Sequence, residues 1–333
     1  MDALAKYQID RFFEKFSPIS QDVCDNEAAN IAGGGTIKPT SMQGAQSYTV
    51  QIVNDEKSLV VQFRDPKSPI DLDLMTTARE TYGRVVPDCQ HLKGRPGPLL
   101  VYKMNYISGE SFLLARTALH SAENFGLLSQ TVQDFAVFFA SAWHNRPVSI
   151  LAFNSSLIQN DYLSRLGRIT NKLPVSFSPL LDKLKSQLSS LFTDDYPMVI
   201  NHWDLLENNI HVDLQTGHLT GIVDWGDAEV GPFASQLWGL ENIIGIRTTT
   251  GMRFHSQHVQ LRRLFWQKFY KEIGDVSEGV KEAIHTSRMI GIFLANGDFA
   301  SAPADAREME ETVLRSITLE LSDVGLRTSG GSS

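Results

Sequence analysis

The first hundred residues switch between helix-like and strand-like spacing of apolar side chains. Apolar residues recur at intervals of three and four in 2–16 and 71–82, which predicts two amphipathic helices. Residues 47–53 and 59–64 instead alternate apolar with polar side chains, and the polar link between them predicts a β-hairpin. Residues 99–104 are typical of a further strand. This part of the chain is therefore expected to form a small sheet with a few helices.

Beyond residue 105 the pattern becomes mainly helical. Helical spacing recurs at 135–143, 180–192, 261–273, 280–294 and 304–324. We therefore expect an α+β fold with a strand-rich N-terminal lobe at 1–104 and a larger helical lobe at 105–327. The small, polar residues 328–333 are expected to form a flexible tail.

Composition and charge narrow the class of protein. The 333 residues are 42% hydrophobic and 20% charged, which is typical of a globular chain. Thirty basic against 38 acidic residues give a net charge of −8, which disfavours nucleic acid as a partner. No apolar run approaches the roughly 20 residues that span a bilayer, and the N-terminus does not resemble a secretory signal. Cys24 and Cys89 form no disulfide or zinc pattern, so we expect a cytoplasmic protein that does not bind membranes.

The segment 197–232 concentrates polar side chains between short apolar runs. A predicted strand leads to Asp204 and Asn209, and a predicted hairpin with its turn near 215–217 then ends at Asp224. In an antiparallel hairpin, the start of the first strand lies beside the end of the second. Oxygens of Asn209 and Asp224 are therefore expected to converge on one cation, with Asp204 in the loop just before them.

These residue types suit phosphoryl transfer. One carboxylate and one amide oxygen leave most of the coordination shell of Mg²⁺ open for phosphate oxygens and water. A second carboxylate nearby can orient an attacking hydroxyl and accept its proton. The segment supplies such a combination, with Asn209 and Asp224 as metal ligands and Asp204 as the catalytic acid–base group.

At this point the sequence resembles a known family, the small-molecule kinases of the aminoglycoside phosphotransferase and choline kinase type. The family's His-x-Asp-x-x-x-x-Asn run corresponds to His202, Asp204 and Asn209. Its Gly-x-[Ile/Val]-[Ile/Val]-Asp-Trp run corresponds to 220–225, with its Asp at position 224. The resemblance covers about residues 30–240. It implies a two-lobed protein-kinase-like fold and supports the same three roles for Asp204, Asn209 and Asp224.

The resemblance also implies positions that contact a nucleotide near residue 105. They are Gly44 and Ser47 in the phosphate-covering loop, Arg64 at the end of a strand, Met104 as the gatekeeper, and Asn105 and Ile107 in the hinge. The acid that partners Arg64 stays open between Asp71 on one helix face and Asp73 or Glu80 on another.

The function implied is an ATP- and Mg²⁺-dependent phosphotransferase that acts on a hydroxyl of a small organic molecule, with a cationic acceptor as one option. Two alternatives follow from the glycine-poor phosphate loop and the bulky Trp203: a kinase-like module that binds without transferring phosphate, and a repurposed enzyme of natural-product metabolism. A metal hydrolase is a weaker alternative based on His211, Asp213 and His218. Scattered candidates for acceptor contacts in the helical lobe are Asp227, Trp238 and Glu241.

Overall fold

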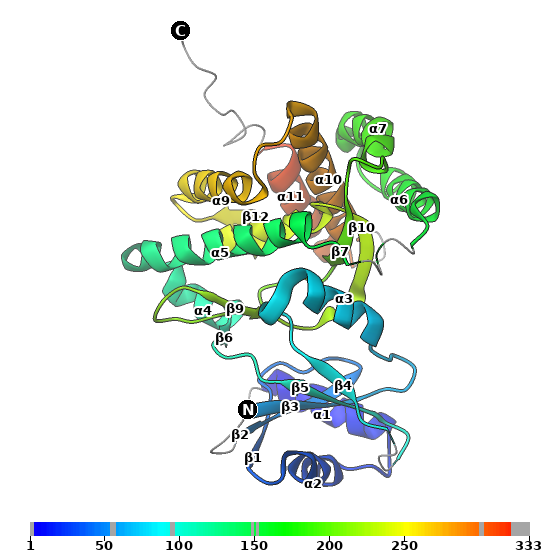
Figure 1. The fold of residues 1–333 in the computed structure, drawn as a ribbon, viewed down its shortest axis with the longest axis vertical. Coiled ribbons are helices and arrows are strands. Elements are labelled where there is room, and N and C mark those ends of the chain that lie inside the picture. The colour runs from blue at the N-terminus through cyan, green and yellow to red at the C-terminus, as the bar shows by residue number, and fades with distance from the viewer. Residues whose placement is uncertain are drawn as a thin grey trace. The chain divides into compact units, whose positions relative to one another are not determined.

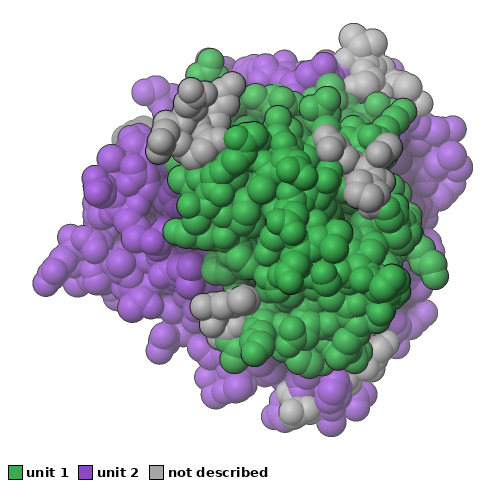
Figure 2. All heavy atoms as spheres, turned by 90° about the horizontal axis from the view of Figure 1, so that it is seen from below, with its two compact units in different colours: residues 1–79, 83–108, 221–226 green, residues 80–82, 109–220, 227–333 purple. Residues whose placement is uncertain are grey.

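The computed structural model describes residues 3–53, 58–93, 97–147, 150, 153–299 and 303–320, so the expected tail at 328–333 lies outside the described residues. The chain divides into two compact units, coloured separately in Figure 2. Unit 1 consists of residues 1–79, 83–108 and 221–226, and unit 2 of residues 80–82, 109–220 and 227–333. None of the helices in the described ranges has the length and apolar character needed to cross a membrane.

Unit 1 is built on an antiparallel sheet of five strands in the order β1-β2-β3-β5-β4 (Figure 1). The strands are β1 (Thr36–Pro39), β2 (Ser47–Val53), β3 (Ser58–Arg64), β4 (Cys89–His91) and β5 (Leu100–Asn105). The alternating side chains Tyr48, Val50 and Ile52 are fully buried, as the apolar pattern requires. The predicted strands β2, β3 and β5 are confirmed, while the link at 54–57 lies outside the described residues.

Two helices pack on this sheet. They are α1 (Ala3–Lys15) and α2 (Gln21–Ala32), and they contribute Ile9, Phe12, Cys24 and Ala28 to its apolar core. The apolar spacing predicts α1 but not α2, because the buried side chains of α2 are small. Ser20 caps the start of α2, and Gly33 ends it with a φ of 74°, a left-handed conformation that glycine adopts without strain.

Unit 2 is mainly helical. Its helices are α4 (Phe112–Leu119), α5 (Phe125–His144), α6 (Ser155–Thr170), α7 (Ser178–Gln187), α8 (Leu240–Ile244), α9 (His258–Ile273), α10 (Glu278–Asn296) and α11 (Ala304–Thr318). Helix α3 (Leu72–Tyr82) begins in unit 1 and ends in unit 2. The strands are β6 (Glu110–Ser111), β7 (Met198–His202), β8 (Ile210–Val212), β9 (Leu219–Ile222), β10 (Ala228–Pro232), β11 (Gly245–Thr248) and β12 (Gly251–Phe254). They pair as β10-β7, β11-β12 and β6-β8-β9.

Aromatic side chains form the centre of unit 2. Helix α5 packs along α9, where the rings of Phe139 and Phe265 lie 6.1 Å apart. The predicted helix at 135–143 is correct but too short, because α5 buries Leu128 and Val132 a further two turns toward its start. The β11-β12 hairpin was not predicted. Its pairing is local, and its side chains are mostly half-buried, so the alternation is weak.

A buried ion-pair cluster connects α8, α9 and α10. Arg262 donates from both terminal nitrogens to Glu241, at 2.8 and 2.5 Å, and Arg288 donates to the same carboxylate at 2.5 Å. Burial alone would raise the pKa of Glu241, but the charges and hydrogen bonds of Arg262 and then Arg288 outweigh it and lower the pKa from 4.5 to about 2. Glu241 is therefore ionised and fully engaged inside the protein.

We expect Glu241→Gln to lower the free energy of unfolding at pH 7 by about 3 kcal/mol or more, because it leaves two buried guanidinium groups without a carboxylate. A carboxyl whose folded pKa is depressed stabilises the fold above its unfolded pKa and loses this effect as the pH falls toward its folded pKa. The difference between wild type and variant should therefore shrink from pH 5 toward pH 2, as measured by urea unfolding.

Glu278→Gln serves as the control, because Glu278 is highly exposed and pairs with Lys281 on the surface of α10. Its effect should stay below about 1 kcal/mol at every pH. A gap between wild type and Glu241→Gln that does not change with pH would contradict the assigned ionisation.

Candidate active site

The loop that carries Asp204 starts from a firmly held strand. Strand β7 pairs with β10, so that His202 lies opposite Ala228. His202 is almost fully buried; its backbone N–H donates to Oε1 of Gln236 at 2.8 Å, and its ring nitrogen Nδ1 accepts from the backbone N–H of Asp204 at 3.1 Å. His202 therefore braces the loop, and this leaves the chemistry to the residues that follow.

Gln236 and Tyr82 extend this support, and sequence analysis identified neither. Gln236 donates from Nε2 to the hydroxyl of Tyr82 at 2.5 Å, and Tyr82 donates to the carbonyl of Ile200 at 2.6 Å. Burial raises the pKa of Tyr82 well above its ordinary value, so the hydroxyl stays protonated. Nothing in the local sequence marks Gln236, because its role depends on a strand more than thirty positions away.

The structure brings Asp204 and Asn209 together within unit 2. Nδ2 of Asn209 donates to Oδ2 of Asp204 at 2.7 Å and to the backbone carbonyl of Asp204 at 2.8 Å. Asn209 is 4% exposed, while Asp204 is half-buried. With its Nδ2 used in this way, Asn209 presents Oδ1 as an acceptor, and that oxygen also receives a bond from Asn208 at 2.8 Å. A carbonyl oxygen has two lone pairs, so one remains suitable for a cation.

Contacts from α4 and α8 hold the same loop. Arg116 of α4 forms an ion pair with Glu207 at 2.8 Å, and the backbone N–H of Leu113 donates to the Glu207 carbonyl at 3.0 Å. Asn242 donates to the carbonyl of Leu205 at 2.9 Å. These bonds come from two separate helices, so the backbone between Asp204 and Asn209 has little freedom to move.

The indole of Trp203, next to Asp204, lies against Arg165 and Tyr162 within unit 2. The guanidinium carbon of Arg165 is 5.1 Å from the Trp203 ring centroid, and the ring of Tyr162 is 6.4 Å away. Arg165 in turn pairs with Glu229 at 3.0 Å. Trp203 therefore has a packing role, and this weakens its use as an argument for a non-catalytic module.

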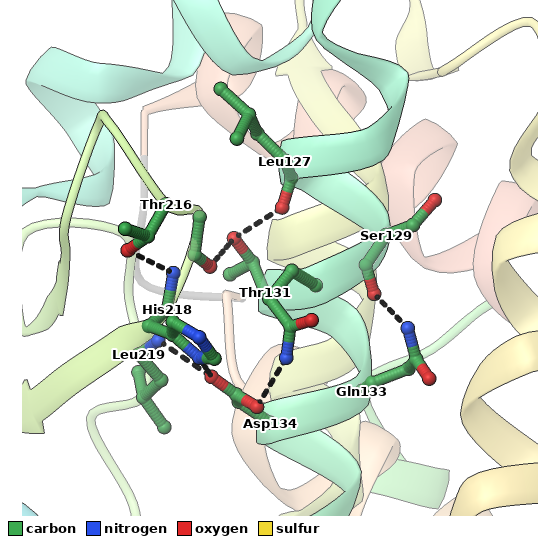
Figure 3. A network of polar contacts seen from close by, with 10 residues as sticks. Leu127, Ser129, Thr131, Gln133, Asp134, Thr216, His218 and Leu219 are labelled. Carbon is green, nitrogen blue, oxygen red and sulfur yellow. Dashed lines mark hydrogen bonds and ion pairs between the residues drawn. The ribbon is translucent and has the colours of Figure 1, made fainter.

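The turn between β8 and β9 is docked on α5 (Figure 3). Asp134 accepts from the imidazole of His218 at 2.7 Å and from the backbone N–H of Leu219 at 3.1 Å. Thr131 donates to the carbonyl of Gly217 at 2.7 Å. The contacts fix the hairpin whose first strand begins directly after Asn209. Neither Asp134 nor Thr131 was predicted, because the first is a half-buried and the second a buried residue of a helix that carries no motif.

Arg64 and Asp224 belong to unit 1, where both face Gly226. A Cβ on Gly226 would lie 3.2 Å from Nη2 of Arg64 and 3.6 Å from Oδ1 of Asp224. Asp224 has a φ of 61°, a left-handed conformation that is uncommon for residues other than glycine. Backbone strain of this kind is found most often at functional sites. A guanidinium and a carboxylate therefore lie close to one glycine at the end of β3.

The acid partner of Arg64 that the sequence left open is not found on α3. Asp71 caps that helix instead, because Oδ1 accepts from the backbone N–H groups of Asp73 and Leu74 at 3.0 Å. Arg64 itself donates from Nε to the carbonyl of Ser68 at 2.5 Å and from Nη1 to Gln62 at 3.3 Å. Over the described ranges, no carboxylate forms an ion pair with Arg64.

The loop with Gly44 and Ser47 is tightly held despite its single glycine. A Cβ on Gly44 would lie 2.9 Å from the hydroxyl of Ser47, and Ser47 is 4% exposed. The buried Gln43 binds both backbone groups of Thr49, with distances of 2.8 and 2.9 Å, and so fixes the loop to β2. Gln43 was missed because its partners are backbone atoms, which leave no pattern in the sequence.

The predicted hinge residues lie at and beyond the end of β5. Met104 pairs with Val60 of β3, and Asn105 pairs with Leu59. The side chain of Asn105 accepts from the backbone N–H of Asp88 at 2.5 Å. Ile107 is buried against Gly221, where an added Cβ would lie 2.5 Å from Cγ2 of Ile107. The side chains of Asn105 and Ile107 are therefore engaged within unit 1.

The side chains of Asn209 and Asp224 are each of a type that suits a hard divalent cation better than zinc. Asn209 and Asp224 offer oxygen ligands, as Mg²⁺ prefers. No group of three or more His, Cys, Asp or Glu side chains in the described part of the chain could hold a metal ion. The hydrolase alternative based on His211, Asp213 and His218 therefore lacks a ligand set there.

Comparisons with known proteins agree with this chemistry. The model of the phosphotransferase enzyme family matches residues 42–254. No curated protein sequence matches the chain.

Two solved structures share the fold at low identity. Amicoumacin kinase hAmiN is 14% identical, with a TM-score of 0.56 over 94% of this chain and 96% of its own. Spectinomycin phosphotransferase APH(9)-Ia is 12% identical, with a TM-score of 0.54 over 93% of this chain and 100% of its own. The expected fold class and the expected enzyme class are confirmed: the chain belongs to the phosphotransferase enzyme family and has its two-lobed protein-kinase-like fold.

Proposed function

We propose that this phosphotransferase transfers the γ-phosphoryl group of ATP, with Mg²⁺, to a hydroxyl of a small organic molecule. The observation that carries the proposal is the hydrogen-bonded pair of Asp204 and Asn209 in a loop anchored at both ends. The family match supports transfer. The structurally similar spectinomycin phosphotransferase binds ADP and spectinomycin, and hAmiN binds AMP-PNP and Ca²⁺, which supports a nucleotide and a small-molecule acceptor here.

Asp204 is assigned as the group that orients the acceptor hydroxyl and takes its proton. The bond from Asn209 to Oδ2 fixes the direction of the carboxylate, and its half-buried position keeps it accessible. Positioning of this kind converts random encounters into aligned attack and supplies a large share of the acceleration in phosphoryl transfer.

Asn209 and Asp224 are assigned as ligands of the divalent cation. When bound, Mg²⁺ neutralises charge on the phosphate oxygens. Asn209, directly before β8, contributes Oδ1. Asp224 contributes its carboxylate from a backbone conformation that is uncommon for a residue with a side chain. Neither side chain needs to lose an ion pair in the described structure to serve in this way.

The nucleotide contacts are assigned to unit 1. Arg64 presents a guanidinium, which binds phosphate bidentately. Gly44 and Ser47 supply the phosphate-covering loop, and Met104, Asn105 and Ile107 border the base. The proposal specifies the acceptor only as a molecule that carries a hydroxyl. Amine-bearing acceptors are the first panel to test, because the chain carries a net charge of −8 and attracts cations. We place the reaction in the cytoplasm.

Asp204→Ala should lower turnover by ~10²-fold or more, because the acceptor hydroxyl loses its orienting carboxylate. The expected measurement is transfer of γ-labelled phosphate from ATP to a panel of amino alcohols and aminoglycosides, alongside ATP binding by thermal shift. Binding should change little.

Asp182→Ala provides the matched control, because Asp182 is an exposed acid on α7 that pairs with Lys185. Equal turnover in wild type and Asp204→Ala would remove the role of Asp204. Saturable ATP binding without label in any product would favour the binding module instead.

Asp224→Ala should abolish the Mg²⁺-dependent part of nucleotide binding while the protein stays folded, because Ala removes a charged ligand. We expect the thermal shift with ATP to rise on addition of Mg²⁺ in the wild type and to stay flat in the variant. Asp227→Ala, directly after Gly226, is the comparison for nearby charge. A Mg²⁺ response that survives in Asp224→Ala would show that the ion is held elsewhere.

A further inference from the structure

Lys15, the last residue of α1, lies beside the phosphate-binding end of the β2-β3 hairpin. Its ammonium group forms a short ion pair with Asp65, the residue that follows Arg64, and lies 3.4 Å from Oε1 of Gln46. Asp65 is 3% exposed, whereas the Lys15 side chain is half-exposed. The family match begins at residue 42, so this contact comes from a helix outside it.

The ion pair secures a turn that the local sequence already encodes. Asp65-Pro66-Lys67-Ser68 has Asp at the first and Pro at the second position of a β-turn, which are the preferred residues there. The turn is closed by a bond from the Ser68 N–H to the Asp65 carbonyl at 2.9 Å. Oδ1 of Asp65 also accepts from the Lys67 N–H at 2.9 Å, which leaves Oδ2 for Lys15.

The 65–68 turn holds the side chain of Arg64. The carbonyl of Ser68 accepts from Nε of Arg64 at 2.5 Å, so the position of the turn decides the direction of the guanidinium. Nη2 is then the nitrogen that faces Gly226. A continuous series of bonds therefore connects the ammonium group of Lys15 with the phosphate-binding group assigned above.

The two N-terminal helices hold the neighbouring strand as well. The hydroxyl of Tyr48 donates to Asp25 of α2 at 2.6 Å, and the ring of Phe13 lies 5.0 Å from that of Tyr48. Ser47 pairs with Arg64 across the hairpin, directly beside the Tyr48–Phe63 pair. The backbone N–H of Asp65 also donates to the carbonyl of Gln46 at 2.9 Å, next to Ser47.

We propose that Lys15 is a positioning residue for nucleotide binding: through Asp65 and the 65–68 turn it fixes the guanidinium of Arg64 for phosphate contact. This inference rests on the proposed function. Without Lys15, Asp65 would be a buried carboxylate that lacks its cation, and such a group relaxes toward water and carries the turn with it. The hydrogen bond of Lys15, followed by that of the Lys67 N–H, lowers the pKa of Asp65 and keeps it ionised.

The test compares Lys15→Met with Lys6→Met, an exposed lysine on the same helix. We expect Lys15→Met to raise both KM for Mg·ATP and Kd for Mg·AMP-PNP about tenfold, because the loss of a charge-assisted hydrogen bond weakens binding by about this factor. The same variant should change kcat less than about twofold. Lys15→Arg and the double variant Lys15→Met/Asp65→Asn should recover most of the affinity, since the first restores the cation and the second removes the unpaired charge. Lys6→Met should behave like wild type.

A second readout does not depend on nucleotide. The Nε–Hε NMR signal of Arg64, identified by its absence in Arg64→Lys, should shift or broaden in Lys15→Met and return in the double variant. The inference is overturned if Lys15→Met keeps wild-type affinity and an unchanged Arg64 signal. It is also overturned if Lys15→Met lowers the melting temperature but leaves KM unchanged. A wild type that binds no Mg·AMP-PNP overturns the proposed function instead, and the Arg64 signal then decides alone whether Lys15 orients that side chain.

Discussion

The side-chain amide of Asn209 holds the Asp204 carboxylate in one direction. Nδ2 of Asn209 bonds both to that carboxylate and to the backbone carbonyl of the same residue, and this closes the loop into a ring. An aspartate without such a bond would sample several rotamers. The productive rotamer would then have to be regained in every turnover. Here the rotamer is fixed before any substrate arrives. The same amide leaves its oxygen for the cation, so one residue connects the two parts of the proposed chemistry.

The supports around this loop are mostly bonds to backbone atoms. Gln236 binds the N–H of His202, Asn242 binds the carbonyl of Leu205, and the N–H of Leu113 binds the carbonyl of Glu207. Buried backbone groups must be paired, and partners from distant elements satisfy them while fixing the loop in space. Most of unit 2 therefore contributes to the site without supplying a side chain that touches substrate.

The sequence predicts the sheet strands of unit 1 better than the contacts of the candidate site. Strands β2, β3 and β5 follow their alternating pattern, whereas the hydrogen bond between Asp204 and Asn209 was not predicted, and the convergence of Asn209 and Asp224 on one cation stays a prediction. Helix α2 and the hairpin β11-β12 were missed, because the first buries small side chains and the second is only half-buried. Gln43, Tyr82 and Gln236 were missed for a different reason. Their partners are backbone groups or distant residues, and one sequence does not reveal such pairings.

The two guanidinium groups on Glu241 affect which acceptors the enzyme can hold. In the sequence Glu241 is one of the scattered candidates for acceptor contacts, yet it is surrounded by Arg262 and Arg288 and is 2% exposed. The trio carries one surplus positive charge within the helical core. An ammonium group that approached it would meet repulsion, so Glu241 drops out as a counter-charge for an amine-bearing acceptor.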